Sequence, residues 1–223
     1  MFKKTIVSIL ILSMLANLFA MSVFAAPEGS GYNATTVAKI VQKTNMEDLQ
    51  AKSAVMIDSA TGNVLFEKDS HQKLPLASVT KVMTMLLVME AIDSGKVKYE
   101  DQVPVSIHAY EMGGSQINLD PREVFSVHDL LKALAIQSAN DAAVALAEKV
   151  AGSEDTFVKM MNEKAAQLGM QNTNFLDSNG LTDEGHYSTA YDIALMSKEL
   201  IAKHPKILEY TSIWHDTIRD GKT

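Results

Sequence analysis

The stretch SVTKVMTMLLVMEAID (residues 78–93) predicts a long helix that is apolar on nearly every side. Such a helix belongs at the centre of a domain, so a lysine in its first turn is expected to be desolvated. Desolvation lowers the pKa of an amine toward the range in which it acts as a base. Ser78 precedes Lys81 by one helical turn, which predicts that the hydroxyl and the amine share one face. This is the arrangement of a nucleophile with its own base.

By itself, the pattern Ser-x-x-Lys is weak evidence for a catalytic pair. Serine is a common residue at a helix start, and a lysine in the first turn can extend its amine to solvent. The chain also contains a second copy, SHQK (residues 70–73), in a polar stretch that we interpret as a solvated loop. The interpretation of Ser78 and Lys81 as catalytic residues therefore depends on a second motif.

That second motif is Ser138-Ala139-Asn140, in a short polar break between two helical patterns. The preceding helix is expected to begin after Ser126, with Asp129 at capping-box spacing, and the following helix is expected to stop at Gly152. Side chains in a break between two buried helices either face a cleft or satisfy backbone groups. Alone, the asparagine is better interpreted as a residue that ties the connection together. Combined, the two motifs support a catalytic interpretation.

The two motifs, sixty positions apart, resemble those of the penicillin-recognising serine acyltransferases. The sequence around them is similar to the low-molecular-mass penicillin-binding proteins, which are serine-type D-alanyl-D-alanine carboxypeptidases. The resemblance covers roughly residues 49–210. The blocks that carry it are residues 54–58, 76–81, 113–115, 137–143, 161–165, 168–170 and 185–190.

The resemblance implies a mechanism. Ser78 would attack the carbonyl between the last two D-alanines of a peptidoglycan stem peptide, and water would then hydrolyse the acyl-enzyme. Lys81 would accept the serine proton, Ser138 would relay a proton to the leaving amine, and the Asn140 amide would bind the substrate backbone. β-Lactam antibiotics would be trapped on Ser78. Neither a cofactor nor a metal ion is implied.

The chain departs from the family pattern at its end. Relatives carry a third motif, Lys-Thr-Gly, about a hundred residues after the second, and this chain ends in Asp220-Gly221-Lys222-Thr223. Lys222 comes only 84 positions after Ser138, and Asp-Gly after the strand-like run 213–218 predicts a hairpin turn. We therefore interpret Lys222-Thr223 as accidental. The 223 residues are expected to form an incomplete fragment of such an enzyme, truncated at its C-terminus, with little activity alone.

Two other functions remain open. A class A-like β-lactamase shares the first two motifs, but it activates its deacylating water with a glutamate in a Glu-x-x-Leu-Asn context, which this chain lacks. A catalytically inactive cell-wall-binding protein of the same fold is the alternative from another class. The intact residues of the first two motifs argue against it, whereas the incomplete third motif argues for it.

Residues 1–25 have the features of a signal peptide: two early lysines, an apolar run and small residues before Ala26. An uncleaved membrane anchor is the alternative. Residues 26–48 are expected to form a linker, and residues 49–223 a transpeptidase-like domain. We therefore expect an exported, extracytoplasmic protein of the cell envelope, which associates with the membrane only through a segment not present here.

Composition excludes several function classes. There is no cysteine, so the chain has no disulfide framework and no cysteine nucleophile. The formal net charge of −7, without a basic cluster, argues against nucleic acid as a partner. Six scattered histidines, including His128 and His186, lack metal-ligand spacing and are interpreted as structural or solvated.

The expected fold class is α+β: a helical cluster packed on an antiparallel sheet, with the C-terminal strands of the sheet missing from this chain. Two strands, residues 54–57 and 63–66, should form a hairpin. Helices are expected at residues 78–93, 127–137, 141–151, 154–168 and 190–202, the last with a capping box of Thr189 and Asp192.

Overall fold

The computed structural model describes residues 49–182 and 184–221. The predicted signal peptide and the predicted linker, residues 1–25 and 26–48, both lie outside these residues. The chain divides into two units, residues 1–49 and 50–223, and the second contains every helix and strand described below.

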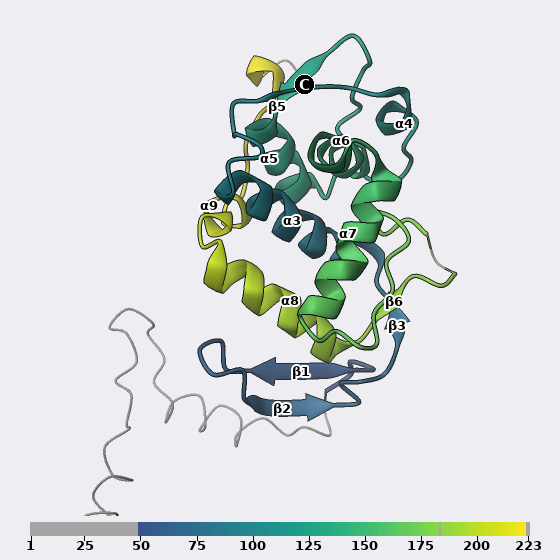
Figure 1. Ribbon diagram of the computed structural model, residues 1–223, viewed down its shortest axis with the longest axis vertical. Coiled ribbons are helices and arrows are strands. Elements are labelled where there is room, and N and C mark those ends of the chain that lie inside the picture. The colour runs from purple at the N-terminus through teal and green to yellow at the C-terminus, as the bar shows by residue number, and fades with distance from the viewer. Residues whose placement is uncertain (1–48, 183, 222–223) are drawn as a thin grey trace, which may run out of the picture. The chain divides into compact units, whose positions relative to one another are not determined.

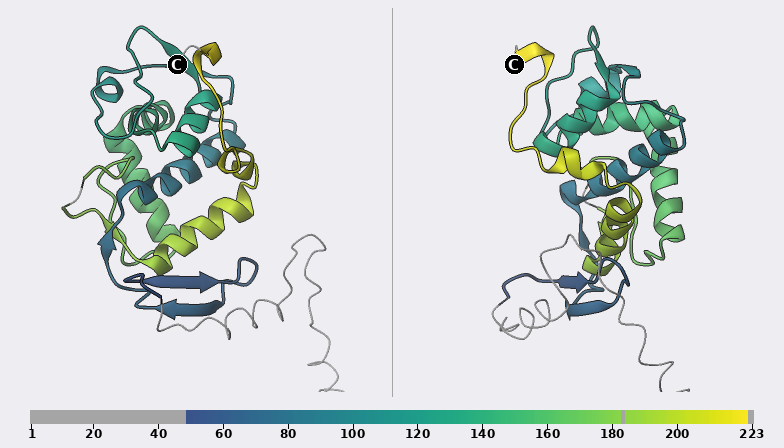
Figure 2. Two further views of the ribbon diagram at one scale, coloured as in Figure 1. Left: turned by 180° about the vertical axis from the view of Figure 1, so that it is seen from behind. Right: turned by 90° about the vertical axis from the view of Figure 1, so that its left-hand side faces the viewer.

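A central helix, α3 (Lys81–Asp93), organises the fold. It contacts α6 (Asn140–Ala151), α7 (Glu154–Gln167) and α8 (Ala190–Lys203), which surround it in Figures 1 and 2. Most of its residues are buried, as its apolar sequence predicts. The predicted first turn is a separate 3-10 helix, η2 (Ala77–Thr80), which carries Ser78. Within residues 49–182 and 184–221, no helix combines the length and the apolar character needed to cross a membrane.

The helices around α3 begin and end close to the predicted positions. α5 (Val127–Gln137) begins after Ser126, whose hydroxyl accepts a hydrogen bond from the Asp129 N–H at 3.0 Å. α8 begins in the same way, with Thr189 accepting from the Asp192 N–H at 3.1 Å. α6 ends at Gly152, whose φ of 83° is the left-handed conformation that favours glycine. Two short helices, α4 (Ile107–Tyr110) and α9 (Ile207–Thr211), were not predicted.

The described strands form three antiparallel pairs. β1 (Ala54–Ile57) and β2 (Val64–Lys68) form the predicted hairpin, and β1 contacts α8 (Figure 1). β3 (Leu74–Pro75) pairs with β6 (Tyr187–Ser188), and β4 (Gln102–Pro104) pairs with β5 (Val124–Ser126). Strands of two or three residues give no periodic signal, so the last two pairs were not predicted. The α+β class is confirmed.

The prediction of a strand at residues 213–218 is wrong. This segment is irregular, and a 3-10 turn, η3 (Arg219–Gly221), occupies the position of the predicted hairpin turn. No described strand pairs with it, and a strand needs a partner for its backbone hydrogen bonds. Side chains hold the segment instead. Asp216 accepts from the Lys132 amine at 2.9 Å, and Arg219 binds the Glu123 carboxylate at 2.6 Å.

Candidate active site

Ser78 and Lys81 are brought into contact by the junction between η2 and α3. The Lys81 Nζ lies 3.2 Å from the Ser78 Oγ. Ser78 is exposed, whereas Lys81 is only 2 % exposed, because it begins the central helix. The predicted juxtaposition of the hydroxyl and the amine on one face is therefore present, with the hydroxyl open to a substrate and the amine shielded from water.

Burial changes the chemistry of Lys81. It lowers the pKa of the amine to about 8, and the opposing attraction of the Asp177 carboxylate limits the shift. Roughly a tenth of the amine is then neutral at pH 7, compared with less than a thousandth for an ordinary lysine. The amine also donates a hydrogen bond to the backbone carbonyl of Asn179 at 2.7 Å. A carbonyl oxygen only accepts, so this bond fixes one N–H of the amine. The lone pair of the neutral form can then face the Ser78 hydroxyl.

The carbonyl of Asn179 belongs to a tight loop, residues 177–182, which we call the base loop. The Asp177 carboxylate folds it by accepting hydrogen bonds from three backbone N–H groups: Asn179 at 3.0 Å, Gly180 at 2.5 Å and Thr182 at 2.7 Å. Burial alone would raise the pKa of Asp177, but a hydrogen bond from the Thr182 side chain, together with these backbone hydrogen bonds, keeps the pKa below its ordinary value. Asp177 is therefore ionised, and its carboxylate holds the base loop in its folded form.

The second motif lies where α5 meets α6. Ser138 ends α5 in the left-handed conformation, with a φ of 55°, and its side chain is half-buried. Asn140 begins α6. Its side-chain nitrogen donates to the Gly113 carbonyl at 2.7 Å, and its backbone N–H donates to the Ser115 carbonyl at 2.7 Å. Because the amide nitrogen is used inside the protein, the amide oxygen is the atom that can accept a hydrogen bond from a substrate.

The two motifs meet through the base loop. A Cβ placed on Gly114 would lie 2.8 Å from the Asn140 Nδ2 and 3.6 Å from the Leu181 side chain. Asn140 is thus close to the loop that binds Lys81. In the described part of the chain, the Ser138 hydroxyl makes no direct hydrogen bond to Ser78 or Lys81. The structure therefore joins Ser78 and Lys81 directly, and the second motif to them only through intervening loops.

Sequence reasoning missed two carboxylates that organise this region, Asp177 and Asp141. Asp141 follows Asn140 directly and is fully buried, and it accepts from the backbone N–H groups of Ile117 at 3.1 Å and Leu119 at 3.0 Å. Only the base loop had a recognisable signal. Its sequence, Asp-Ser-Asn-Gly, has the turn residues in which an aspartate binds the backbone a few positions ahead.

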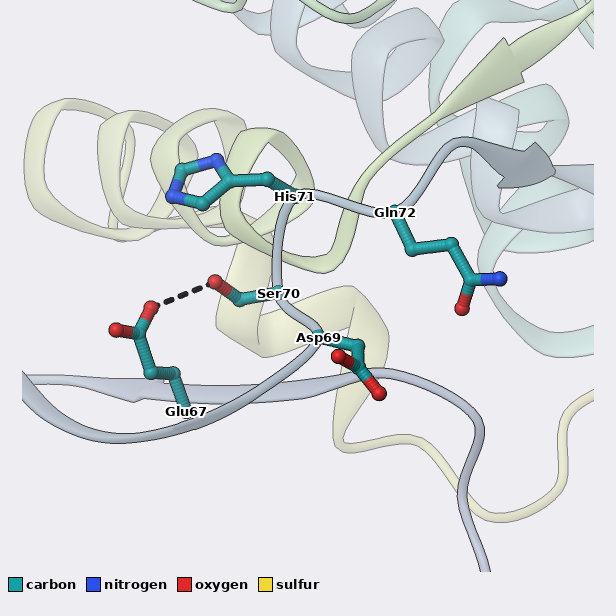
Figure 3. A pocket seen from close by; sticks show the side chains of 5 residues that line it. All are labelled: Glu67, Asp69, Ser70, His71 and Gln72. Carbon is teal, nitrogen blue, oxygen red and sulfur yellow. Dashed lines mark hydrogen bonds between the residues drawn. The ribbon is translucent and has the colours of Figure 1, made fainter.

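The second Ser-x-x-Lys copy does not form a similar pair. Ser70 is buried, and its hydroxyl donates to the Glu67 carboxylate at 2.7 Å, as Figure 3 shows. The Lys73 amine lies over the Tyr187 ring, 4.6 Å from its centroid. The expectation that this copy is a solvated loop is correct for His71, Gln72 and Lys73, which are exposed, and wrong for Ser70. This serine has a structural partner rather than a base.

The two histidines singled out in the sequence both have structural partners. The His128 Nδ1 lies 2.7 Å from the Tyr210 hydroxyl, and the His186 Nε2 lies 2.7 Å from the Thr80 hydroxyl. Across residues 49–182 and 184–221, no group of three or more potential metal-ligating side chains comes together.

Comparison with known proteins identifies the family. A family model described as D-alanyl-D-alanine carboxypeptidase matches residues 38–223. The chain belongs to this family. The penicillin-binding-protein-like fold expected from the sequence is confirmed by solved structures: penicillin-binding protein 6B from Escherichia coli is 36% identical with a TM-score of 0.73, and the match covers 76% of this chain and 55% of that one.

Other known proteins are similar over most of this chain. DacF of Bacillus subtilis is 47% identical over 218 residues, which are 98% of this chain and 53% of DacF. DacC of Escherichia coli is 40% identical over 78% of this chain and 45% of DacC. Penicillin-binding protein D2 from Listeria monocytogenes, solved in a cefotaxime-bound form, is 34% identical with a TM-score of 0.69, covering 78% of this chain and 70% of that one. The chain spans about half the length of the curated relatives it matches.

Proposed function

We propose that this chain carries the nucleophile and the base of a serine-type D-Ala-D-Ala carboxypeptidase, which removes the terminal D-alanine from peptidoglycan stem peptides. The observation that supports it most directly is the contact between Lys81 and Ser78, with the amine buried and its pKa lowered to about 8. A buried amine of this kind accepts the proton of the neighbouring hydroxyl as the hydroxyl attacks a carbonyl carbon.

The reaction proceeds through an acyl-enzyme. The Ser78 oxygen bonds to the carbonyl carbon of the penultimate D-alanine, and its proton passes to the Lys81 nitrogen. Ser138 relays a proton to the nitrogen of the leaving D-alanine, and the peptide bond breaks. Asn140 binds the backbone of the acyl part. A water molecule then attacks the ester carbonyl, which releases the shortened peptide and restores the serine hydroxyl.

The substrate class and location follow from the same proposal. Relatives are named D-alanyl-D-alanine carboxypeptidases, and one solved relative holds a β-lactam. We therefore expect stem peptides ending in D-Ala-D-Ala as substrates and β-lactams as inhibitors. Because the substrate is part of the cell wall, the protein acts outside the cytoplasm. The features of residues 1–25 fit this location as those of an export signal.

The test is covalent labelling with benzylpenicillin, followed by intact-mass measurement. It uses the full chain and a chimera in which the part of Bacillus subtilis DacF beyond the matched residues follows Thr223 in register, so that the third motif expected of the family is supplied. Ser78→Ala is the test variant. Ser70→Ala is the matched control, because Ser70 belongs to the other Ser-x-x-Lys copy but bonds to Glu67.

We expect the chimera and its Ser70→Ala variant to gain the mass of one penicillin molecule, and the Ser78→Ala variant to gain none. The full chain should label much more slowly than the chimera, because an oxyanion donor and a carboxylate-binding lysine come with the third motif. A folded chimera that fails to label would favour an inactive cell-wall-binding protein. Rapid turnover of the penicillin, without release of D-alanine from a peptide, would favour a β-lactamase.

A further inference from the structure

His186 connects the two chain segments that surround the Lys81 amine. It lies just before β6 and is only 1 % exposed. Its Nε2 is 2.7 Å from the hydroxyl of Thr80, the residue immediately before Lys81. Its Nδ1 accepts from the backbone N–H of Leu176 at 3.1 Å, and Leu176 immediately precedes the base loop. One imidazole therefore bonds to both segments that surround the amine.

The partners of His186 define its protonation. A backbone N–H only donates, so the Nδ1 facing Leu176 must be the unprotonated nitrogen. The proton then resides on Nε2 and is donated to the Thr80 hydroxyl. Burial lowers the pKa of His186 more than the nearby Asp177 carboxylate raises it, which favours the same neutral form. In a doubly protonated ring, the Nδ1–H would point at the N–H of Leu176, and two donors cannot form a hydrogen bond.

The base loop has further attachments that do not involve the histidine. The Thr84 hydroxyl donates to the Ser178 carbonyl at 2.5 Å, and the Glu154 carboxylate accepts from both the backbone N–H and the hydroxyl of Ser178. These bonds hold the loop against α3 and α7. His186 adds a hydrogen bond to Thr80, which ties the start of the loop to the turn that carries Ser78.

We propose that His186 is a positioning residue for the general base. By its hydrogen bond to Thr80, the neutral imidazole keeps the carbonyl of Asn179 and the Ser78 turn at the separation at which the Lys81 amine reaches both. The imidazole itself transfers no proton to or from the substrate. This inference rests on the proposed function, because it concerns the base of that reaction.

Two substitutions separate this role from a general contribution to folding. In His186→Gln the amide nitrogen takes about the position of Nε2, so the bond to Thr80 is retained. In His186→Asn the side chain ends near the position of Nδ1, so only the bond to Leu176 is retained. Neither change alters the charge of the neutral site. Thr80→Val, with Thr80→Ser as its control, removes the same bond from the other side.

The primary measurement is the rate at which acetic anhydride acetylates Lys81 in the full chain as a function of pH, followed by mass spectrometry of the peptide. This rate reports the pKa and accessibility of the amine without needing an active enzyme. The second measurement is the acylation rate constant for a fluorescent penicillin in the chimera described above, separated from the binding constant. Thermal unfolding followed by circular dichroism establishes that each variant is folded.

We expect wild type, His186→Gln and Thr80→Ser to label with a midpoint near pH 8, the pKa of Lys81. In His186→Asn and Thr80→Val the midpoint should rise by about one unit as the amine becomes hydrated. Their acylation rate constant should fall about tenfold at unchanged binding, since a displaced base slows only the chemical step.

The inference is overturned if the asparagine and glutamine variants behave alike, or if both lose thermal stability while the Lys81 midpoint stays near pH 8. If the wild-type chimera is not acylated at all, the proposed function has failed. The acetylation midpoints then still decide whether His186 positions Lys81, because they do not depend on turnover.

Discussion

The backbone of Gly180 lies directly against the carbonyl of Ala77. A Cβ on Gly180 would stand 1.9 Å from the Ala77 oxygen, and the φ of Gly180 is 84°. This contact closes the base loop onto the 3-10 turn that carries Ser78. Glycine is required here both for its left-handed conformation and for the missing side chain.

Gly180→Ala should therefore lower the free energy of unfolding by more than about 2 kcal/mol, since backbone atoms must separate to admit the methyl group. Urea denaturation measures this loss. Gly169→Ala is the control, because Gly169 has a φ of 77° but nothing within 4 Å of its Cβ position. It should cost only about 1 kcal/mol, from backbone strain alone. Equal losses in the two variants would show that the Gly180–Ala77 contact contributes nothing specific.

The pKa of Lys81 predicts how acylation depends on pH. The neutral amine is the base, and its fraction rises as the pH increases toward the pKa of about 8. The acylation rate of the chimera should therefore climb through neutral pH and level off above a midpoint near 8. Stopped-flow measurements with a fluorescent penicillin across this range would record the midpoint.

Asp177→Asn should move that midpoint to lower pH. The carboxylate stabilises the protonated amine and so raises the pKa of Lys81. Removing the charge leaves burial unopposed, and the pKa falls. Asp155→Asn is the control, since Asp155 is an exposed carboxylate in the first turn of α7. A midpoint that rises in Asp177→Asn would mean that the base loop opens and hydrates the amine.

Asp141 should contribute to the stability of the fold through its hydrogen bonds to the backbone at residues 117 and 119. Asp141→Ala leaves the partly buried N–H of Ile117 and the buried N–H of Leu119 without acceptors, which should cost about 2–4 kcal/mol in urea denaturation. Asp141→Asn keeps one acceptor oxygen and should cost less. Hydrogen exchange at Ile117 and Leu119 should accelerate in the same order. If exchange is unchanged in the alanine variant, the loop at residues 113–119 does not depend on this carboxylate.

The attachment of the C-terminal segment should depend on Arg219. Its guanidinium binds the Glu123 carboxylate through two nitrogens and also donates to the carbonyls of Ile117 and Asn118. Arg219→Ala should release the segment, which would accelerate chymotryptic cleavage after the 96 % exposed Trp214 by about tenfold.

Arg122→Ala provides the control for that experiment. Arg122 forms an ion pair with Asp120, but its side chain is 89 % exposed, and exposed pairs contribute little to stability. Its removal should leave the cleavage rate unchanged. If the two variants are cleaved at the same rate, Arg219 does not hold the segment.

Much of the helical framework could be predicted from the sequence, because helices depend on local signals. The apolar run at residues 81–93, the capping residues Ser126 and Thr189 and the glycine at 152 act within one or two turns of the helix they define. The Ser78–Lys81 pair was predictable for the same reason, since its members are only three positions apart. The incorrect strand at residues 213–218 shows the limit of local reasoning, because a strand requires a partner.

The long helices, the two motifs and the resemblance to a family could all be obtained from the order of the amino acids. How Lys81 is held depends instead on the tertiary structure. Its acceptor, the Asn179 carbonyl, lies 98 positions away along the chain, and the Thr80–His186 bond spans 106 positions. No periodicity encodes such contacts, because they arise when the base loop packs against the start of α3. The lowered pKa of Lys81 has the same origin: the residue type permits it, and burial in the assembled core produces it.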